Sequence, residues 1–325
     1  MNVVIGSFEQ GLIYALMAIG VYLAFRILDY PDLTVDGSFP LGAAVSTLLV
    51  TKGFNPFFSL LFALLAGGIA GFITGVLHTK GKVNSLLAGI LTMTALYSVN
   101  LKIMGTANLS LFRFDTIFTP FNYLKEMITQ SLGNSVITSA FNDWLYSILL
   151  LVFVVIVKKT IDWFLQTELG LAIRATGDNP SMIRSVGVNT DYSTIVGLVL
   201  SNALVGLSGG MMAQYQGYAD IQMGIGMIVV GLASVIIGEA IFGDRSIQRA
   251  TFAVISGAII YRLVIALALY LPGFSPTDMK LITALLVILS LTLPRFSLKK
   301  KKKEAVAKKN IQSIDYSMEK ATKEG

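Results

Sequence analysis

Long apolar blocks alternate with short polar connections along most of the chain. A helix that crosses the hydrocarbon core of a bilayer needs about 20 mostly apolar residues. Six of the nine blocks approach or exceed that length. The second, fifth and last fall short and must recruit flanking residues or be re-entrant. The blocks are 3–28, 39–50, 57–77, 86–104, 144–157, 192–212, 225–242, 250–271 and 281–293. This pattern predicts an all-α polytopic membrane bundle of about 8–10 spanning or re-entrant helices.

The overall composition supports the same class of protein. Hydrophobic residues make up 54% of the chain and charged residues only 14%, whereas soluble domains carry about a quarter charged residues. The first block lacks a basic segment before it and a small-residue cleavage site after it. We therefore expect a retained helix there and not a removed signal peptide.

The positive charge is concentrated at the C-terminus and predicts the orientation. Residues 295–325 hold ten Lys/Arg and four Asp/Glu, which equals the net charge of +6 for the whole chain. Such a run after the last apolar block predicts a disordered cytoplasmic tail beside anionic lipid, and not a nucleic-acid partner. With this tail inside, nineteen of the 25 Lys/Arg fall on the inner side and five outside. The bias predicts a bacterial cytoplasmic membrane protein with an outer N-terminus.

Two polar interruptions precede Gly-rich helices. They cover residues 29–38, on the predicted inner side, and 216–224, on the outer side. Paired breaks of opposite orientation are typical of inverted repeats with a solute path near their interface, although two ordinary loops are the alternative. Gly67, Gly71 and Gly75 form a small-residue ridge that permits close helix contact.

The inner connection 158–191 contains the signals of its own short helix. Asn179 is a good N-cap, Pro180 suits the first helical position, and Gly187 can end the helix in the left-handed conformation. The apolar side chains of this helix are Met182, Ile183 and Val186. Exposed apolar residues on a cytoplasmic helix predict a docking surface. A helix that lies on the bilayer or on its own loop is the alternative.

Polar residues within the apolar blocks are candidates for a solute pathway. Arg262 lies in the middle of a block, where an unpaired cation is costly, so it either pairs with a carboxylate or lines the path. The uncharged candidates within helices have interhelical hydrogen bonds as their alternative role. The candidate pathway residues are Asp36, Ser38, Ser98, Asn100, Asn202 and Arg262.

The residue content excludes several kinds of chemistry on this chain. There is no cysteine and only one histidine, His78, so neither a thiolate site nor a histidine metal centre is expected. No Walker A loop is present, and we find no catalytic residue, metal or cofactor site. Energy for transport must come from another chain or from an ion gradient. An ion-coupled secondary transporter is therefore the main rival, although it would more often show a buried acid pair or a histidine relay in mid-span.

A stretch within the inner connection resembles a known family. Gly170, Arg174-Ala175, Asn179 and the closing Gly187-Val188-Asn189 resemble the ATPase-docking segment of ABC importer membrane subunits of the branched-chain amino acid/ribose type. Residues 33–42 and 224–243 resemble two further signatures of that family. Residues 86–108 look most similar to permeases of tryptophan/tyrosine importers.

The resemblance implies a function and a set of partners. Residues 1–294 would form the permease domain, with 158–191 as the ATPase-coupling loop, 105–143 as an extracytoplasmic loop and 295–325 as the tail. The partners would be an ATPase dimer that holds ATP and Mg²⁺, a second permease copy in a homodimer, and a substrate-binding lipoprotein. The solute would be an amino acid, aromatic first and branched-chain next, moved by alternating access. The implied coupling residues are Gly170, Arg174, Asn179, Pro180, Met182, Ile183 and Gly187.

Overall fold

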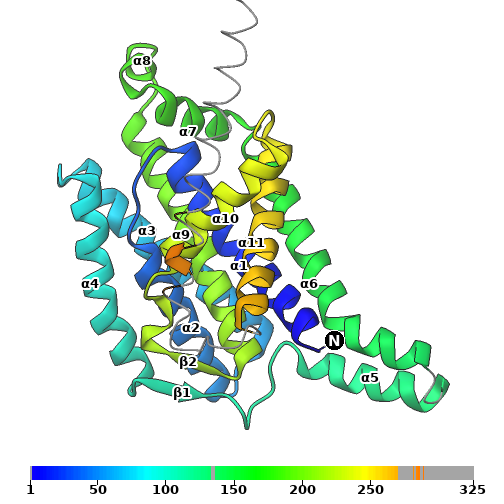
Figure 1. Cartoon of the computed structure of the whole chain (residues 1–325). Helices are drawn as coiled ribbons and strands as arrows, with labels where there is room; N and C mark the ends of the chain where they lie inside the picture. The colour runs from blue at the N-terminus through cyan, green and yellow to red at the C-terminus, as the bar shows by residue number, and fades with distance from the viewer. Residues whose placement is uncertain (1, 133–135, 270–280, 282, 286–287, 289–325) are drawn as a thin grey trace, which may run out of the picture.

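Helices account for nearly all of the secondary structure in the computed structural model of the chain (Figure 1). The structure describes residues 2–132, 136–269, 281, 283–285 and 288. The α-helices are α1 (Asn2–Tyr22), α2 (Val35–Thr51), α3 (Pro56–Thr79), α4 (Ser85–Met104), α5 (Thr119–Leu132), α6 (Val136–Phe164), α7 (Glu168–Asp178), α8 (Pro180–Ser185), α9 (Thr190–Gln216), α10 (Met227–Phe242) and α11 (Ile247–Leu269). A π-helix, η1 (Leu23–Ile27), and a 3-10 helix, η2 (Ile221–Gly224), are also present. Two short strands, β1 (Asn108–Ser110) and β2 (Tyr218–Asp220), complete the elements.

Seven helical segments of the described chain are long and apolar enough to cross a membrane. The prediction of a polytopic helix bundle is therefore confirmed. The short fifth block belongs to α6, a helix of 29 residues, so of the two predicted alternatives this block recruits flanking residues and is not re-entrant. The second block corresponds to α2, which has only 17 residues. The ninth block and the predicted tail lie mostly or wholly outside the described residues.

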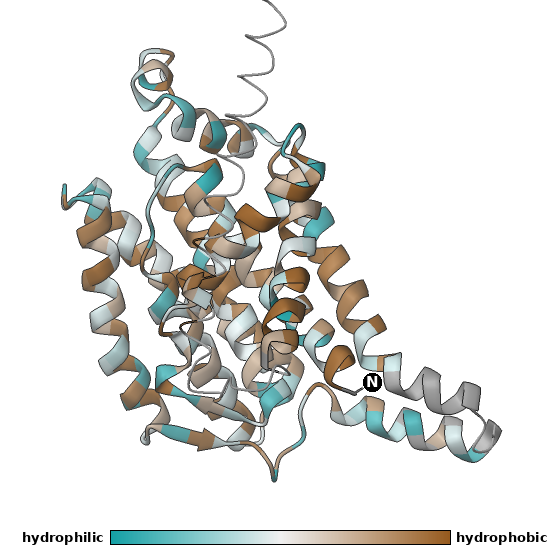
Figure 2. Ribbon diagram, viewed as in Figure 1, coloured by the Kyte–Doolittle hydropathy of each residue, from teal (hydrophilic) through white to brown (hydrophobic). Residues whose placement is uncertain are grey.

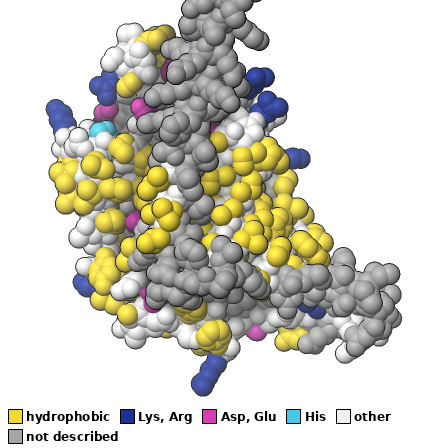
Figure 3. Space-filling view, in the orientation of Figure 1, with side chains coloured by type: hydrophobic (Ala, Val, Ile, Leu, Met, Phe, Trp, Pro, Cys, Tyr) yellow, Lys and Arg dark blue, Asp and Glu magenta, His cyan; other side chains and the backbone are white. Residues whose placement is uncertain are grey.

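The outer surface of the bundle is apolar, as contact with lipid requires. Hydrophobic residues dominate the middle of the helices (Figure 2). On the face shown in Figure 3, hydrophobic side chains cover much of the middle zone on both sides of the grey atoms, and most of the visible Lys and Arg side chains lie nearer the two ends. Phe58, Phe62 and Ile69 on α3 are exposed in this single chain. The protein is thus a multi-pass membrane protein.

The two ends of the bundle differ, and we name them by their elements. The α8 end carries α7, α8 and the α10–α11 connection, and the sheet end carries the N-terminus, α5 and the two strands (Figure 1). β1 pairs antiparallel with β2, with Leu109 opposite Ala219. The sequence predicts a loop over 105–143, whereas the structure forms β1 and α5 within it. The predicted inner connection begins at residue 158, whereas α6 continues to Phe164.

The buried centre is formed by α1 and α9, which pack against α2, α3 and α11. The predicted glycine ridge of α3 lies against α9. A Cβ atom on Gly67 would be 2.2 Å from the Asn202 carbonyl oxygen, and one on Gly71 would be 2.2 Å from that of Leu198. These distances are shorter than any real Cβ contact, so only glycine permits this spacing.

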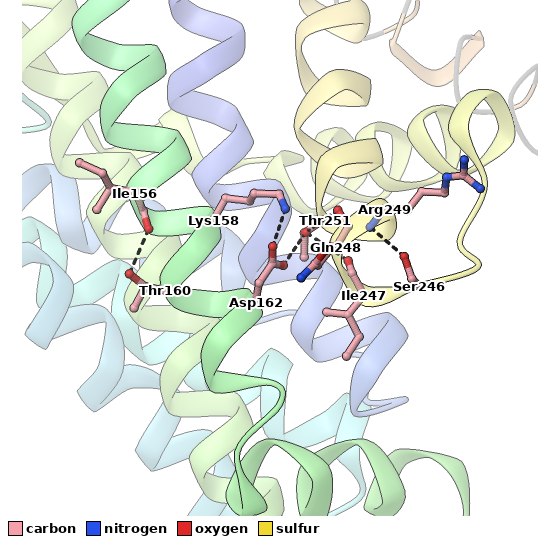
Figure 4. A network of polar contacts seen from close by, with 9 residues as sticks. All are labelled: Ile156, Lys158, Thr160, Asp162, Ser246, Ile247, Gln248, Arg249 and Thr251. Carbon is pink, nitrogen blue, oxygen red and sulfur yellow. Dashed lines mark hydrogen bonds and ion pairs between the residues drawn. The ribbon is translucent and has the colours of Figure 1, made fainter.

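A polar contact joins α6 to α11 near the α8 end (Figure 4). Lys158 and Asp162, one turn apart on α6, form an ion pair, and the Thr251 hydroxyl of α11 donates to Asp162 Oδ1 at 2.6 Å. Asp162 is only 6% exposed. Since a buried carboxylate needs partners, this contact fixes the C-terminal turns of α6 against α11.

Candidate functional site

The helix α7 directly precedes the short helix of the predicted docking segment and packs against the bundle. The Thr167 side chain caps α7 by accepting a hydrogen bond from the Gly170 N–H at 3.3 Å. A Cβ on Gly170 would lie 2.2 Å from the Phe164 carbonyl oxygen, and one on Gly177 would lie 2.1 Å from that of Ile27. The two glycines thus let α7 lie directly on the ends of α6 and η1. The helix α7 was not predicted from the sequence, although Thr167 followed by an acidic first turn signals its start.

The short helix α8 has the local structure that the sequence predicts. Asn179 Oδ1 accepts a hydrogen bond from the Met182 N–H at 3.0 Å, and Pro180 occupies the first position. Gly187 follows the helix with a φ of +93°, and the Val188 N–H donates to the Ile183 carbonyl. Both ends of α8 are therefore fixed by its own residues, and these predictions are confirmed.

The helix α8 projects beyond the rest of the bundle at the α8 end (Figure 1). None of its residues is buried, and the side chains of Met182 and Val186 are 61% and 71% exposed. Arg184 ties α8 to the start of α9 through hydrogen bonds to Thr190 Oγ1 and Asp191 Oδ1. A force on α8 would therefore reach α9, the central helix of the bundle.

Residues of η1 and α7 line an open pocket of about 690 Å³ beside this surface. Arg174, one of the predicted coupling residues, lines it together with Arg26. Arg26 also pairs with Glu239 at 3.0 Å and Asp244 at 3.1 Å, which joins the end of the first span to the end of α10. The coupling candidates thus lie near the ends of several spans, not on an isolated loop.

The two predicted breaks meet inside the bundle. The chain enters α2 from the α8 end and reaches α10 from the sheet end, so the two short helices begin at a shared junction (Figure 1). The Asp36 carboxylate of α2 accepts hydrogen bonds from the Gly226 N–H at 3.0 Å and the Ile228 N–H at 2.8 Å. A negative charge at a helix N-terminus is favourable, so Asp36 stabilises the start of α10. Two short helices that the chain enters from opposite ends of the bundle fit the inverted-repeat interpretation.

Replacing Asp36 by alanine is expected to destabilise the bundle by about 2 kcal/mol, because two backbone N–H groups lose their acceptor inside the membrane. The loss of native protein on heating, followed by size-exclusion chromatography in detergent, measures this effect. Asp115→Ala, at an exposed position of the sheet end, is the control. Equal behaviour of the two variants would contradict a capping role for Asp36.

Two of the predicted pathway residues lie in a buried hydrogen-bond network. Ser38 Oγ donates to Asn202 Oδ1 at 2.7 Å, and Asn202 Nδ2 donates to Asp32 Oδ2 at 2.6 Å. Asp32 Oδ1 accepts from the Thr34 N–H. All of these side chains are fully buried. In this conformation Asn202 forms the interhelical bond that was its alternative to a pathway role, and Ser38 is its partner. The sequence analysis did not single out Asp32, which stands in the same break as Asp36.

The remaining pathway candidates have different surroundings. On α4, Ser98 is exposed, whereas Asn100 is buried and its Nδ2 donates to the Gly37 carbonyl. Arg262 of α11 donates to Gln10 of α1, and its guanidinium carbon lies 4.8 Å from the centre of the Tyr14 ring. Within the described residues, Arg262 thus contacts an amide and a ring and not the carboxylate that was expected as one alternative.

Comparison with known proteins agrees with this geometry. Residues 3–291 match the family model described as branched-chain amino acid transport system / permease component. The chain is 41% identical over 305 residues to a tyrosine transport system permease protein of Clostridioides difficile, covering 94% of this chain and 96% of that protein. It is 34% identical over 296 residues to an uncharacterized protein of Rickettsia prowazekii, covering 90% and 98%. An autoinducer 2 import system permease protein of Yersinia pseudotuberculosis is 27% identical over 234 residues, covering 71% and 60%. No solved structure matches the chain.

Proposed function

The chain belongs to the family of permease components of branched-chain amino acid transport systems, and on that premise we propose that it forms the pore of an ATP-driven amino acid importer. As a member of this family it is a permease subunit and not itself an enzyme. The proposal adds the source of energy, the solute and the partners.

The observation that carries the proposal is the apolar surface at α8, formed by the exposed side chains of Met182 and of Val186, the residue that follows the helix, together with the partly buried Ile183. This short helix has no buried residue, yet it is capped at both ends and joined to α9 by Arg184. Such a rigid, apolar, protruding element is suited to a groove on another protein. We assign that groove to a separate ATPase subunit, which holds ATP and Mg²⁺, on the cytoplasmic side.

The mechanism that we propose is alternating access. Two ATPase subunits close on ATP and push α8, and the Arg184 contacts pass this movement to α9. Because α9 packs closely against α2 and α3 through glycines, these helices would move with it as one body. A second copy of the chain would complete the pore as a homodimer.

The proposed solute is an aromatic amino acid, with branched-chain amino acids as the next choice. The support is the similarity to the tyrosine transport system permease of Clostridioides difficile. A substrate-binding lipoprotein would deliver the solute at the sheet end. The ordered elements at that end, β1, β2 and α5, would form the surface on which the lipoprotein docks.

An ion-coupled secondary transporter is the second candidate, and one observation favours it. Asp32 is a fully buried carboxylate whose described partners are uncharged. Mid-membrane acids of this kind bind coupling ions or protons in secondary transporters. The energy source therefore has to be measured.

Reconstitution in proteoliposomes separates the two candidates. We expect uptake of labelled L-tyrosine only when the permease, its ATPase, the binding protein and ATP are all present. Ionophores that dissipate proton and sodium gradients should leave this uptake unchanged. Uptake by the permease alone, driven by an imposed ion gradient and indifferent to ATP, would overturn the ATP-driven function.

A further inference from the structure

A cavity of about 300 Å³ lies between α2 and α4, next to the junction of the two short helices. Asp36 of α2 and Met93, Thr94, Tyr97 and Asn100 of α4 contribute to its lining. The volume is at the lower end of the range for small-molecule sites, about 300–1,000 Å³, and suits a ligand of amino acid size.

Asn100 lines this cavity and carries a buried acceptor that has no hydrogen-bond partner among the described residues. The residue is 1% exposed, and its Nδ2 donates to the Gly37 carbonyl at 3.2 Å. This bond sets the orientation of the amide, because only the NH₂ group can donate. The other amide atom, Oδ1, has no hydrogen-bond partner among the described residues. A buried acceptor left in this state is costly, and a donor on a ligand would satisfy it.

Asp36 adds a negative charge to the same side of the cavity. Its two oxygens each accept one backbone hydrogen bond from the start of α10, and a carboxylate can accept about four. The described lining contains no Lys, Arg or His. The polar part of the cavity therefore offers acceptors, one of them charged, and it suits a cation with several N–H donors.

The rest of the cavity suits an apolar body. Tyr97 is 52% exposed and Met93 is partly buried, so both can contact a ligand. A tyrosine ring attracts a cation above its face, and a methionine side chain adapts to ligands of different shape. A molecule with an apolar body and a primary ammonium group therefore matches both the acceptors and the apolar side chains of the cavity.

We propose that this cavity is the subsite that receives the ammonium group of the transported amino acid. Asn100 Oδ1 and the Asp36 carboxylate accept its hydrogen bonds, and Met93 and Tyr97 contact its side chain. This inference rests on the proposed function, since it takes an amino acid as the solute. Asp36 also caps α10, so an ammonium group that binds Asp36 would compete with the capping bonds and link solute binding to the position of α10.

The natural absence of cysteine from the chain permits a direct test. A Thr94→Cys permease, assembled with its ATPase and binding protein, is labelled with a water-soluble methanethiosulfonate reagent. We expect L-tyrosine and tyramine to slow labelling at least tenfold. We expect 3-(4-hydroxyphenyl)propionate, which lacks the amine, to have no effect. Lys52→Cys, at an exposed position of the sheet end, is the control whose labelling no ligand should change.

Two additional variants make the test specific. Tyr97→Cys provides a second labelling position if Thr94→Cys does not assemble. Asn100→Leu, placed on the labelled background, removes the acceptor at similar size and should raise the concentration of tyrosine needed for protection about tenfold. Unchanged protection in the Asn100→Leu variant would contradict the role of Asn100.

The outcomes separate this subsite from the proposed function. If the wild-type complex imports tyrosine with ATP but tyrosine gives no protection, or the amine-free acid protects equally, the subsite is wrong and the function stands. If the complex does not import tyrosine, the aromatic assignment is wrong. L-leucine, 3-methylbutylamine and 4-methylpentanoate then repeat the comparison and decide the subsite by the same criteria.

Discussion

Replacing both Met182 and Ile183 by aspartate is expected to lower ATP-driven import at least a hundredfold while leaving the bundle folded. The two side chains lie on α8, which has no buried residue, so the change removes an apolar contact from the partner and not from the core. Buried contacts at the centre of an interface are worth about 2 kcal/mol or more each, and two charges there must also be desolvated. Co-purification with the ATPase and uptake of labelled tyrosine are the measurements.

The matched control for this prediction is Ser181→Asp. It adds the same charge to the same short helix at an exposed polar position in its first turn, where an acidic side chain is favourable. We expect near-normal import from this variant. If Ser181→Asp fails as severely as the double variant, charge near α8 and not its apolar surface is decisive, and docking by Met182 and Ile183 is contradicted.

Replacing Gly67 by alanine is expected to destabilise the bundle by about 3 kcal/mol or more, because the added methyl group would overlap the Asn202 carbonyl on α9. The neighbouring Gly68 is the matched control. A Cβ there meets its nearest atom, in the Val199 side chain, at 3.5 Å, which is an ordinary contact. Thermal denaturation in detergent should show a large loss for Gly67→Ala and little change for Gly68→Ala.

Similar losses for both glycine variants would show that the 2.2 Å approach at Gly67 is not decisive, because helix propensity alone favours alanine over glycine at both positions. The close contact between α3 and α9 would then have no special role. Such a result would also weaken the proposed transmission of movement from α8 through α9, since that step requires α3 and α9 to move as one body.

Features that depend on neighbouring residues in the sequence were predictable. The apolar blocks indicated most of the spans, and the ends of α8 followed from Asn179, Pro180 and Gly187 alone. Capping and hydrophobic length are local properties, so one sequence suffices to show them. The fifth span was underestimated because its apolar block is shorter than α6, whose polar ends continue the helix on both sides.

Features that depend on distant parts of the chain were not predictable in the same way. The two breaks could be recognised, but their meeting through Asp36 and the start of α10 joins residues about 190 positions apart. The Asp32–Asn202 bond and the pairing of β1 with β2 are also long-range contacts. A single sequence shows which residues are polar but not which of them face one another. For that reason Arg262 was assigned possible partners that the described structure does not give it.

The central claim is that α8 docks into a separate ATPase. A photo-reactive amino acid placed at position 182 of the full chain, in membranes that contain the complete transporter, tests it most directly. We predict a covalent adduct between the permease and the ATPase after illumination, with none from the same probe at position 52 of the sheet end. If the probe at position 182 reacts only with lipid or with the permease itself, the coupling role of α8 is contradicted.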